Sequence, residues 1–346
     1  MDNIRLTTFS KGSGCGCKIA PAVLETILHG ARSNRDFPGL LVGNESSDDA
    51  AVLELPGGDC LVSTVDFFTP IVDNAFDFGR IAAANAVSDV YAMGGKPVLA
   101  TAILGFPVDK LPAELAGKIL EGAREICDQA GIPLAGGHSI DIPEPVFGLS
   151  VNGIVRKEFL KRNNTACAGD LLFLTKPLGI GILSSAAKRG VASEEETRRS
   201  VETMTQLNDC GPELAAIRGV HAMTDVTGFG LLGHLLEMCE GSGLSAEIRL
   251  SRLRHLEGAL SHRERFVFPD NTYRNWNAYE KKVKGINGPE FISLCDPQTS
   301  GGLLVAVSPD AAEAVVEVLR RHSLNNHTEP IGSFSAAGPA GVTVTE

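Results

Sequence analysis

The sequence predicts a two-domain α/β protein, because the chain is long, rich in glycine and alternates strand-like with helix-like segments. At 346 residues it is too long for one ordinary hydrophobic core, so we expect about two domains. A hydrophobic content of 43%, with 38 glycines and only 5% aromatic residues, is typical of a compact fold with many tight turns. We expect a lead-in segment at residues 1–48, an N-terminal α/β domain at residues 49–157 and a C-terminal α/β domain at residues 168–346.

Short runs of β-branched and apolar residues, bounded by turn residues, predict the strands of the N-terminal domain. We expect these strands at residues 50–55, 60–65, 98–104 and 147–155. Apolar residues at helical spacing predict two helices between the strands, at residues 76–93 and 112–130.

The C-terminal domain is predicted to begin after Gly169-Asp170 with a strand at residues 171–175. Helical patterns follow at residues 181–189, 194–218, 231–241 and 311–322, and two further strands are expected at residues 303–307 and 342–344. Residues 253–288 are polar and only weakly periodic, so we expect an irregular insertion or lid there.

Charge and composition exclude several classes of partner. A formal net charge of -11 argues against non-specific binding to nucleic acid or to an anionic membrane. No apolar run approaches the roughly 20 residues needed to span a bilayer, and the first residues lack the apolar core of a signal peptide. Most of the eight cysteines sit in apolar segments, where a thiol behaves as a small buried hydrophobe. We therefore expect a cytoplasmic protein in a reducing compartment.

Isolated aspartates occur where strands and helices would bring them together. Asp49 precedes the first strand of the N-terminal domain, Asp66 follows the second, and Asp225 precedes a glycine cluster. Asp89 follows Asn85 by four residues, so both side chains project from one face of an alanine-rich helix. Converging acids repel one another unless a cation neutralises them, and Mg²⁺ accepts a few carboxylates together with phosphate oxygens and water.

A simpler interpretation stays open for each of these aspartates, because an aspartate at a strand end usually caps a turn. Asp89 is harder to explain in this way, since a charged residue on a buried helix face needs a partner.

Some glycine-rich runs could bind phosphate, whereas another only imitates a nucleotide-binding motif. Residues 228–233 match the G-x-G-x-x-G spacing, yet the preceding residues are interrupted by polar side chains, so we do not expect a dinucleotide-binding fingerprint. We interpret these glycines as letting a neighbouring segment approach the backbone near Asp225. Residues 135–139 and 296–302 could present bare amides and hydroxyls to a polyphosphate, or could be ordinary turns. The sequence contains no P-loop motif.

The segment Gly-Ser-Gly-Cys-Gly-Cys-Lys at residues 12–18 has the most unusual composition. Glycine on both sides of Cys15 predicts a mobile loop with an unshielded thiol, and Lys18 is close enough to favour the thiolate. Cys15 and Cys17 are too close for an unstrained disulfide, and a metal knuckle would need a second cysteine pair. The segment is either a floppy tail or a swinging loop that delivers a soft nucleophile.

Together these motifs resemble the selenophosphate synthetase (selenide, water dikinase) family. The resemblance rests on residues 14–18, 44–45 with 48–51, 66–68, 85–89, 92–97, 136–141, 224–230 and 296–302. These runs follow in order over nearly the whole chain. Two departures are Lys11, where several relatives carry histidine, and residues 269–272, which replace a more glycine-rich turn.

The resemblance implies an aminoimidazole-ribonucleotide-synthetase-like fold and a homodimer whose N-terminal sheets pair in a barrel. It implies conversion of ATP, selenide and water into selenophosphate, AMP and phosphate, with Mg²⁺ and a dependence on K⁺. A selenium-delivery protein is a possible partner, and the sequence leaves the selenium donor open. The resemblance assigns residues to three roles: Cys15 and Lys18 to catalysis; Asp49, Asp89 and Asp225 to Mg²⁺; and Lys18, Asp66, Asp89, Gly137, His138 and Ser139 to the nucleotide.

Two alternatives remain open from the residues alone. Another ATP-dependent enzyme of the same fold, of the ribonucleotide cyclase or thiamine-phosphate kinase type, would not need Cys15. A thiol carrier without catalysis would not need Asp89. The sequence also leaves open whether Cys15 forms a covalent selenium adduct or only guides the selenide.

Overall fold

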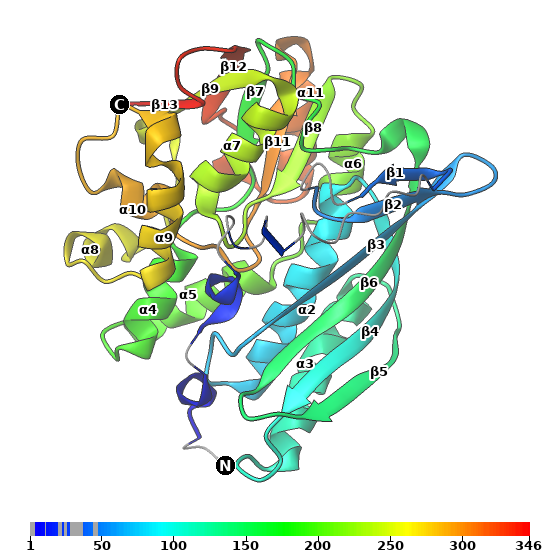
Figure 1. The fold of residues 1–346 in the computed structure, drawn as a ribbon, viewed down its shortest axis with the longest axis vertical. Coiled ribbons are helices and arrows are strands. Elements are labelled where there is room, and N and C mark those ends of the chain that lie inside the picture. The colour runs from blue at the N-terminus through cyan, green and yellow to red at the C-terminus, as the bar shows by residue number, and fades with distance from the viewer. Residues whose placement is uncertain (1–3, 11, 20–22, 24–25, 28–36, 44–47) are drawn as a thin grey trace.

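The computed structural model describes residues 4–10, 12–19, 23, 26–27, 37–43 and 48–346, and contains two mixed β-sheets with helices packed around them (Figure 1). Lys11 and residues 44–45 lie outside the described residues. In the described part of the chain, no helix combines the length and apolar character needed to cross a bilayer.

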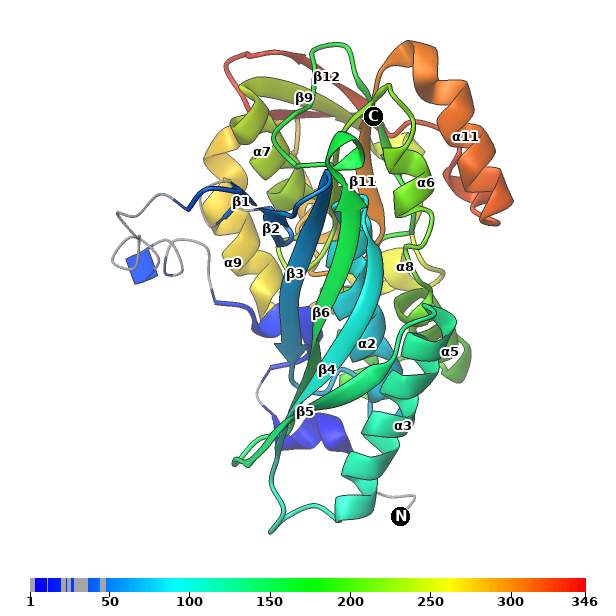
Figure 2. The same cartoon turned by 90° about the vertical axis from the view of Figure 1, so that its right-hand side faces the viewer.

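The N-terminal sheet has six strands in the order β1-β2-β3-β6-β4-β5. Its strands are β1 (Leu40–Val42), β2 (Ala51–Glu54), β3 (Asp59–Phe68), β4 (Lys96–Phe106), β5 (Leu134–Asp141) and β6 (Val146–Arg156). Among the described strands of this sheet, only the edge pair β4–β5 is parallel. Helices α2 (Ala75–Ala92) and α3 (Ala113–Gln129) cover one face of this sheet, and its other face is turned toward the viewer in Figure 2.

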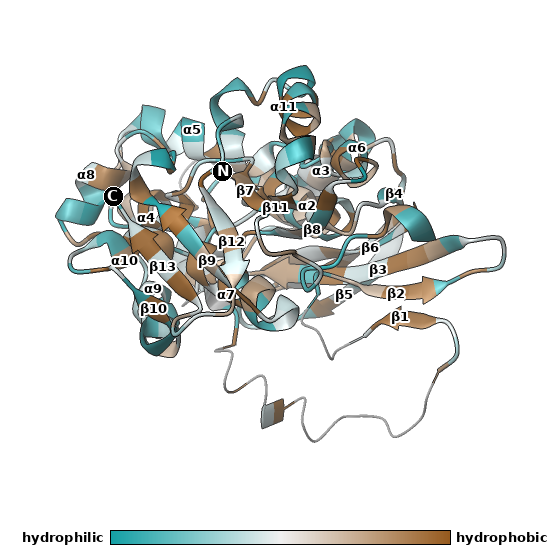
Figure 3. Ribbon diagram, turned by 90° about the horizontal axis from the view of Figure 1, so that it is seen from above, coloured by the Kyte–Doolittle hydropathy of each residue, from teal (hydrophilic) through white to brown (hydrophobic). Residues whose placement is uncertain are grey.

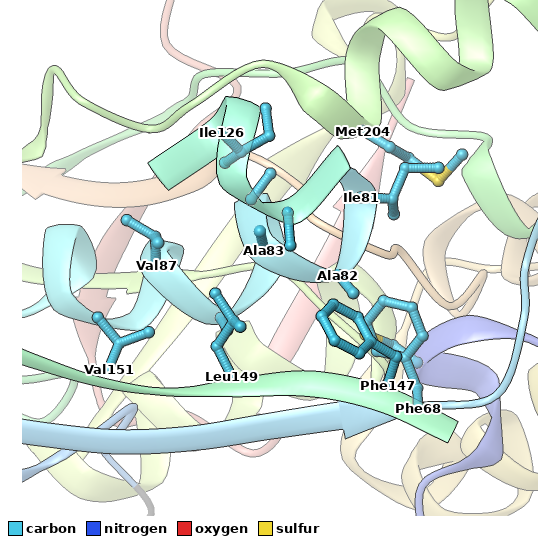
Figure 4. Close-up of a cluster of buried hydrophobic side chains, with 14 of the residues drawn as sticks. Phe68, Ile81, Ala82, Ala83, Val87, Ile126, Phe147, Leu149, Val151 and Met204 are labelled. Atoms are coloured by element: carbon cyan, nitrogen blue, oxygen red, sulfur yellow. The ribbon is translucent and has the colours of Figure 1, made fainter. Parts of the chain in front are cut away.

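Helix α2 is the central element of the molecule. Asn74 caps its first turn by accepting a hydrogen bond from the Asp77 backbone N–H at 3.1 Å. Phe68 and Phe147 of the sheet pack on one side of α2, and Met204 of α5 (Glu194–Thr205) packs near Ile81 (Figure 4). Because α2 is enclosed on several sides, its sequence is rich in small residues, and its polar side chains near the C-terminal end are buried.

The C-terminal sheet has seven strands in the order β10-β13-β9-β12-β7-β11-β8. These strands are β7 (Leu171–Leu174), β8 (Val220–Asp225), β9 (Leu244–Arg249), β10 (Val283–Lys284), β11 (Leu303–Val307), β12 (Gly332–Ala336) and β13 (Val342–Thr345). The helices besides α5 are α4 (Ile180–Lys188), α6 (Gly211–Ala215), α7 (Gly230–Ser242), α8 (Ala259–Glu264), α9 (Asp270–Tyr279), α10 (Glu290–Leu294) and α11 (Ala312–Arg321). Strand β11 is buried along its whole length and is coloured hydrophobic in Figure 3, whereas α5 is mostly hydrophilic.

Several predicted elements need correction. The helix expected at residues 194–218 is two helices, α5 and α6, because the intervening Asn208 turns inward and donates to Ser88 Oγ and to the Gly301 carbonyl, both at 2.8 Å. The segment 253–288 is not irregular, since it contains α8, α9 and β10 and buries Phe268 and Tyr279. Strands β1, β5, β8, β9, β10 and β12 were not predicted.

The close packing of α2 on α3 generates a stability prediction. A Cβ atom at Gly79 would lie 1.8 Å from the Ile119 carbonyl oxygen, so Gly79→Ala must push the helices apart. We expect a loss of about 1–3 kcal/mol, typical of overpacking, measured as a lower urea midpoint. Gly117→Ala on α3 is the matched control, because a Cβ there meets nothing within 4 Å and should be neutral or slightly stabilising. If Gly79→Ala and Gly117→Ala lowered the urea midpoint equally, that result would contradict the close contact between α2 and α3.

Candidate active site

Three predicted carboxylates, those of Asp49, Asp89 and Asp225, meet between the two halves of the chain. Asp49 precedes β2, Asp89 lies near the C-terminal end of α2, and Asp225 ends β8. Burial raises the pKa of all three carboxyls, and the charge of Asp225 raises the pKa of Asp49 and Asp89 further. The three carboxylates therefore lie near one another, as expected, and their mutual repulsion favours a bound cation.

A hydroxyl group holds one oxygen of each carboxylate. Thr224 Oγ1 donates to Asp49 Oδ1 at 2.8 Å, and Ser88 Oγ donates to Asp225 Oδ2 at 2.5 Å. Thr64 Oγ1, on β3, donates in the same way to Asp89 Oδ2.

The second oxygen of Asp49, Oδ2, is buried and has no hydrogen-bond partner among the described residues. A buried acceptor without a donor is costly, and here it belongs to a cluster of repelling carboxylates. This donor set, all oxygen and strongly anionic, fits a hard cation such as Mg²⁺.

Asn85 joins the carboxylates to the thiol segment. This fully buried side chain lies one helical turn before Asp89, and its Nδ2 donates to Asp66 Oδ2. Its Oδ1 accepts from the Ser300 backbone N–H at 2.8 Å and from Cys15 Sγ at 3.2 Å. The sequence places Asn85 on the same helix face as Asp89, but we did not predict it as a site residue. A buried polar residue at helical spacing from Asp89 was the signal that could have identified it.

The thiol segment is docked in the site. Residues Gly14–Cys17 form a 3₁₀ turn, η2, and Cys15 is only 1% exposed, so the expectation of an unshielded thiol is wrong for this conformation. The Cys15 N–H donates to Thr299 Oγ1 at 3.0 Å, and the Gly14 N–H donates to the Thr69 carbonyl at 3.1 Å. Gly14 has φ of +53°, and a Cβ there would lie 2.5 Å from Thr299 Oγ1, so glycine is what permits this docking.

Lys18 brings a positive charge to the site. The carboxylate of Asp66 is the largest cause that raises the pKa of Lys18; Cys15, Asp89 and Asp225 add to it, against the opposing effect of burial. The ammonium group therefore stays protonated among these acidic groups.

Gly228 allows the thiol segment to approach β8. A Cβ at Gly228 would lie 2.7 Å from the Cys15 carbonyl oxygen and 3.1 Å from Lys18 Cδ, which confirms that a neighbouring segment approaches the glycines after Asp225. The reason given for excluding a dinucleotide fingerprint was wrong, because β8 is an almost fully buried strand. The exclusion still holds: β8 pairs antiparallel with β11, whereas the fingerprint needs a parallel βαβ unit.

The carboxylate cluster does not include Gly137, His138 or Ser139 of the same chain. They lie inside the exposed edge strand β5, rather than in the turn that was expected at a strand end. Strands β4 and β6 separate β5 from β3, so about 14 Å of sheet lies between β5 and the strand of Asp66. The register pairs His138 with Ile103, on the face opposite to Thr64 and Asp66.

The run at residues 296–302 supports the site instead of presenting bare amides. Asp296 is fully buried, and its Oδ2 accepts from the Gly181 N–H at the start of α4 at 3.0 Å. Burial raises the pKa of Asp296 to about 8. Thr299 and Ser300 of the same run hold Cys15 and Asn85.

The fold and the family comparisons define the class of this protein. Models of the AIR synthase related family match residues 47–155 for the N-terminal domain and residues 168–344 for the C-terminal domain. A chain of the HypE–HypF complex is 20% identical with a TM-score of 0.70, covering 93% of this chain and 95% of that one. HypE in complex with ATP is 18% identical with a TM-score of 0.67, covering 98% and 94%. The expected aminoimidazole-ribonucleotide-synthetase-like fold is therefore confirmed.

Sequence relatives define the family more narrowly. The selenide, water dikinase of Pasteurella multocida is 53% identical over 321 residues, covering 93% of this chain and 92% of the relative. That of Cronobacter sakazakii is 54% identical, covering 93% and 92%. The chain belongs to the selenide, water dikinase family.

The carboxylate repulsion generates a second prediction. At pH 7, Asp49→Asn should raise the thermal midpoint of the metal-free protein, because burial and the neighbouring acids raise the pKa of Asp49 and so make its ionisation costly in the folded state. A carboxyl whose pKa is raised on folding costs stability above its ordinary pKa of about 4, so the gain should shrink as the pH is lowered toward that value. The same change should reduce the further rise that added Mg²⁺ produces.

Differential scanning fluorimetry with and without Mg²⁺ measures both effects. Asp109→Asn, at an exposed turn position, is the control and should change neither. A lower midpoint for metal-free Asp49→Asn, together with an unchanged response to Mg²⁺, would contradict the cation site.

Proposed function

We propose that this chain is a selenophosphate synthetase that converts ATP, selenide and water into selenophosphate, AMP and phosphate. The observation that carries the proposal is one buried site in which the Cys15 thiol, the Lys18 ammonium and the carboxylates of Asp49, Asp89 and Asp225 come together. The names of the sequence relatives support the substrate and reaction, and HypE bound to ATP supports the nucleotide.

The acidic residues are proposed to hold Mg²⁺ and the phosphates. Asp49, Asp89 and Asp225 would bind the cation, which when present neutralises the charge on the phosphate oxygens. The hydroxyls of Thr64, Thr224 and Ser88 fix these carboxylates in place, so little reorganisation is needed when ATP binds. K⁺ is proposed as an additional requirement from the family resemblance.

The reaction is proposed to proceed by two phosphoryl transfers. In the first, the selenium of hydrogen selenide bonds to the γ-phosphorus of ATP, its proton goes to solvent, and the bond from that phosphorus to ADP breaks. In the second, water attacks the β-phosphorus of ADP and releases AMP and phosphate. Lys18 stays charged and would offset the anionic selenide and γ-phosphate, while Cys15 acts at the selenium.

The thiol segment is proposed to open and close over the site. With Cys15 only 1% exposed, selenide reaches the thiol only when the segment lifts. The contacts of Cys15 with Thr299 and Asn85 are individual hydrogen bonds, which such a movement can break and re-form. A lifted segment is also the state in which a selenium-delivery protein would hand over its cargo.

A homodimer is proposed to complete the nucleotide site. The outer face of the N-terminal sheet carries exposed apolar side chains, including Val65 at 54% and Phe67 at 51%. His138 lies on this same face, so a second copy packed there would bring residues 137–139 toward the nucleotide of the other subunit. This arrangement accounts for the distance between these residues and the carboxylates within one chain.

The decisive experiment follows the products by phosphorus NMR. Protein, ATP, Mg²⁺ and K⁺ are incubated anaerobically with or without selenide, and the nucleotides are resolved. We expect a P–Se product together with AMP, formed only with selenide. ATP consumption that ignores selenide or stops at ADP would contradict the proposal and favour another ATP-dependent enzyme of this fold.

The third prediction separates the thiol from the carboxylates. Cys15→Ser should lose selenophosphate formation but bind a non-hydrolysable ATP analogue within about threefold of the parent, because the acids are intact. Asp89→Asn should weaken binding of the analogue more than tenfold, because the loss of the Asp89 carboxylate from the proposed Mg²⁺ site costs about 1.4 kcal/mol or more of binding free energy. Isothermal titration calorimetry with the ATP analogue, in the presence of Mg²⁺, measures the affinity of both variants. Cys167→Ser changes an exposed cysteine and is the thiol control. Equal loss of binding in Cys15→Ser and Asp89→Asn would refute this division of roles.

The fourth prediction concerns the dimer. Phe67→Glu should shift the chain to a monomer in sedimentation velocity, because a charge would be buried in the proposed interface. Val191→Glu, at a similarly exposed apolar residue in the C-terminal half, should leave the association state unchanged. A parent chain that sediments as a monomer at micromolar concentration would contradict the dimer.

A further inference from the structure

Cys167, Asp170 and His221 form a second cluster of chemically reactive side chains, distinct from the carboxylate cluster. One ligand atom from each residue lies within 4.8 Å of the others. Cys167 and Asp170 belong to the turn that leads into β7, and His221 is the second residue of β8. None of these residues takes part in the proposed reaction.

The cluster is held by a short network of contacts. His221 Nδ1 lies 2.9 Å from Asp170 Oδ1 and 3.0 Å from Asp170 Oδ2, and the Cys167 N–H donates to Asp170 Oδ2 at 2.7 Å. Thr165 Oγ1 donates to the His221 carbonyl at 2.7 Å, which ties the turn to β8. The three side chains are thus fixed near one another by the backbone as well as by their own contacts.

The burial of the three groups differs in a way that suits a metal ion. The Asp170 side chain is 2% exposed and the His221 side chain 31%, while Cys167 is exposed to solvent. The carboxylate is therefore buried, the imidazole is partly exposed, and the thiol is open to solvent. An ion can therefore enter from solvent and keep a water molecule as a further ligand.

We propose that Cys167, Asp170 and His221 bind a thiophilic divalent cation, with Zn²⁺ as the fitting ion. A thiolate, an imidazole and a carboxylate together match the ligand preference of Zn²⁺, whereas Mg²⁺ and Ca²⁺ prefer oxygen alone. On binding, the Cys167 thiol loses its proton to solvent and His221 binds through Nδ1, with its proton on Nε2. The hydrogen bond between His221 and Asp170 is then replaced by two bonds to the ion.

The position of the site gives the bound ion a structural consequence. The Met223 N–H, two residues after His221, donates to the Arg162 carbonyl at 3.1 Å. The Asn163 N–H donates to Asp48 Oδ1 at 2.8 Å, next to Asp49. An ion at Cys167 and His221 therefore fastens the connector between the domains to the strand that ends at Asp225.

Co²⁺ is a suitable spectroscopic probe, because a bond from thiolate to Co²⁺ gives a charge-transfer band in the near ultraviolet. The full chain carrying Cys15→Ser and Cys17→Ser is titrated with Co²⁺, so that thiols of the active-site segment cannot contribute. We expect a thiolate band that saturates at about one Co²⁺ per chain and is displaced by Zn²⁺. Adding Cys167→Ser should abolish the band, and His221→Gln should weaken apparent affinity at least about tenfold.

Controls distinguish this site from others. His322→Gln should leave the band unchanged, because the ring nitrogens of His322 contact the carboxylates of Asp209 and Glu213 and are not part of the Cys167 cluster. Cys167→Ser in the otherwise unaltered chain should retain selenide-dependent activity, which shows that the variant folds. Absence of a thiolate band, or a band that survives Cys167→Ser, would overturn the proposal and leave Asp170 and His221 as a hydrogen-bonded pair.

Discussion

Electrostatic repulsion among buried carboxylates is the constraint on which this structure depends. Asp49 and Asp89 come from the N-terminal half and Asp225 from the C-terminal half, so the repulsion acts across the contact between the domains. Lys18 is a nearby cation whose charge Asp66, Asp89 and Asp225 stabilise. The cation binding proposed above would relieve this repulsion at the contact between the two halves of the chain.

Helix α2 positions the polar side chains that contact these carboxylates. It is buried between the N-terminal sheet and elements of the C-terminal half, so a polar residue on it must find a partner in one or the other. Asn85 reaches Asp66 and Ser300, Ser88 reaches Asp225 and Asn208, and Asp89 reaches Thr64. A single helical face therefore connects the strand ends, the thiol segment and the loop before β11.

The sequence was most informative where local pattern decides the structure. The strands around Val62 and Val151 and the helices α2 and α3 follow from periodicity, and the convergence of Asp49, Asp89 and Asp225 follows from their positions beside these elements. Strand β8 was missed because Thr224 and Asp225 look like interruptions, although their side chains point into the site. The buried state of Cys15 depends on Thr299, which is 284 residues away, and no local pattern carries that information.

The covered position of Cys15 has a consequence for a protein that handles an easily oxidised substrate. In the docked state the thiol is 1% exposed and in contact with Asn85, so peroxide and dissolved oxygen have little access to it. In the mechanism proposed above, the docked segment keeps the Cys15 thiol reduced between turnovers. If the segment lifts as proposed, oxidation of Cys15 is confined to the lifted state.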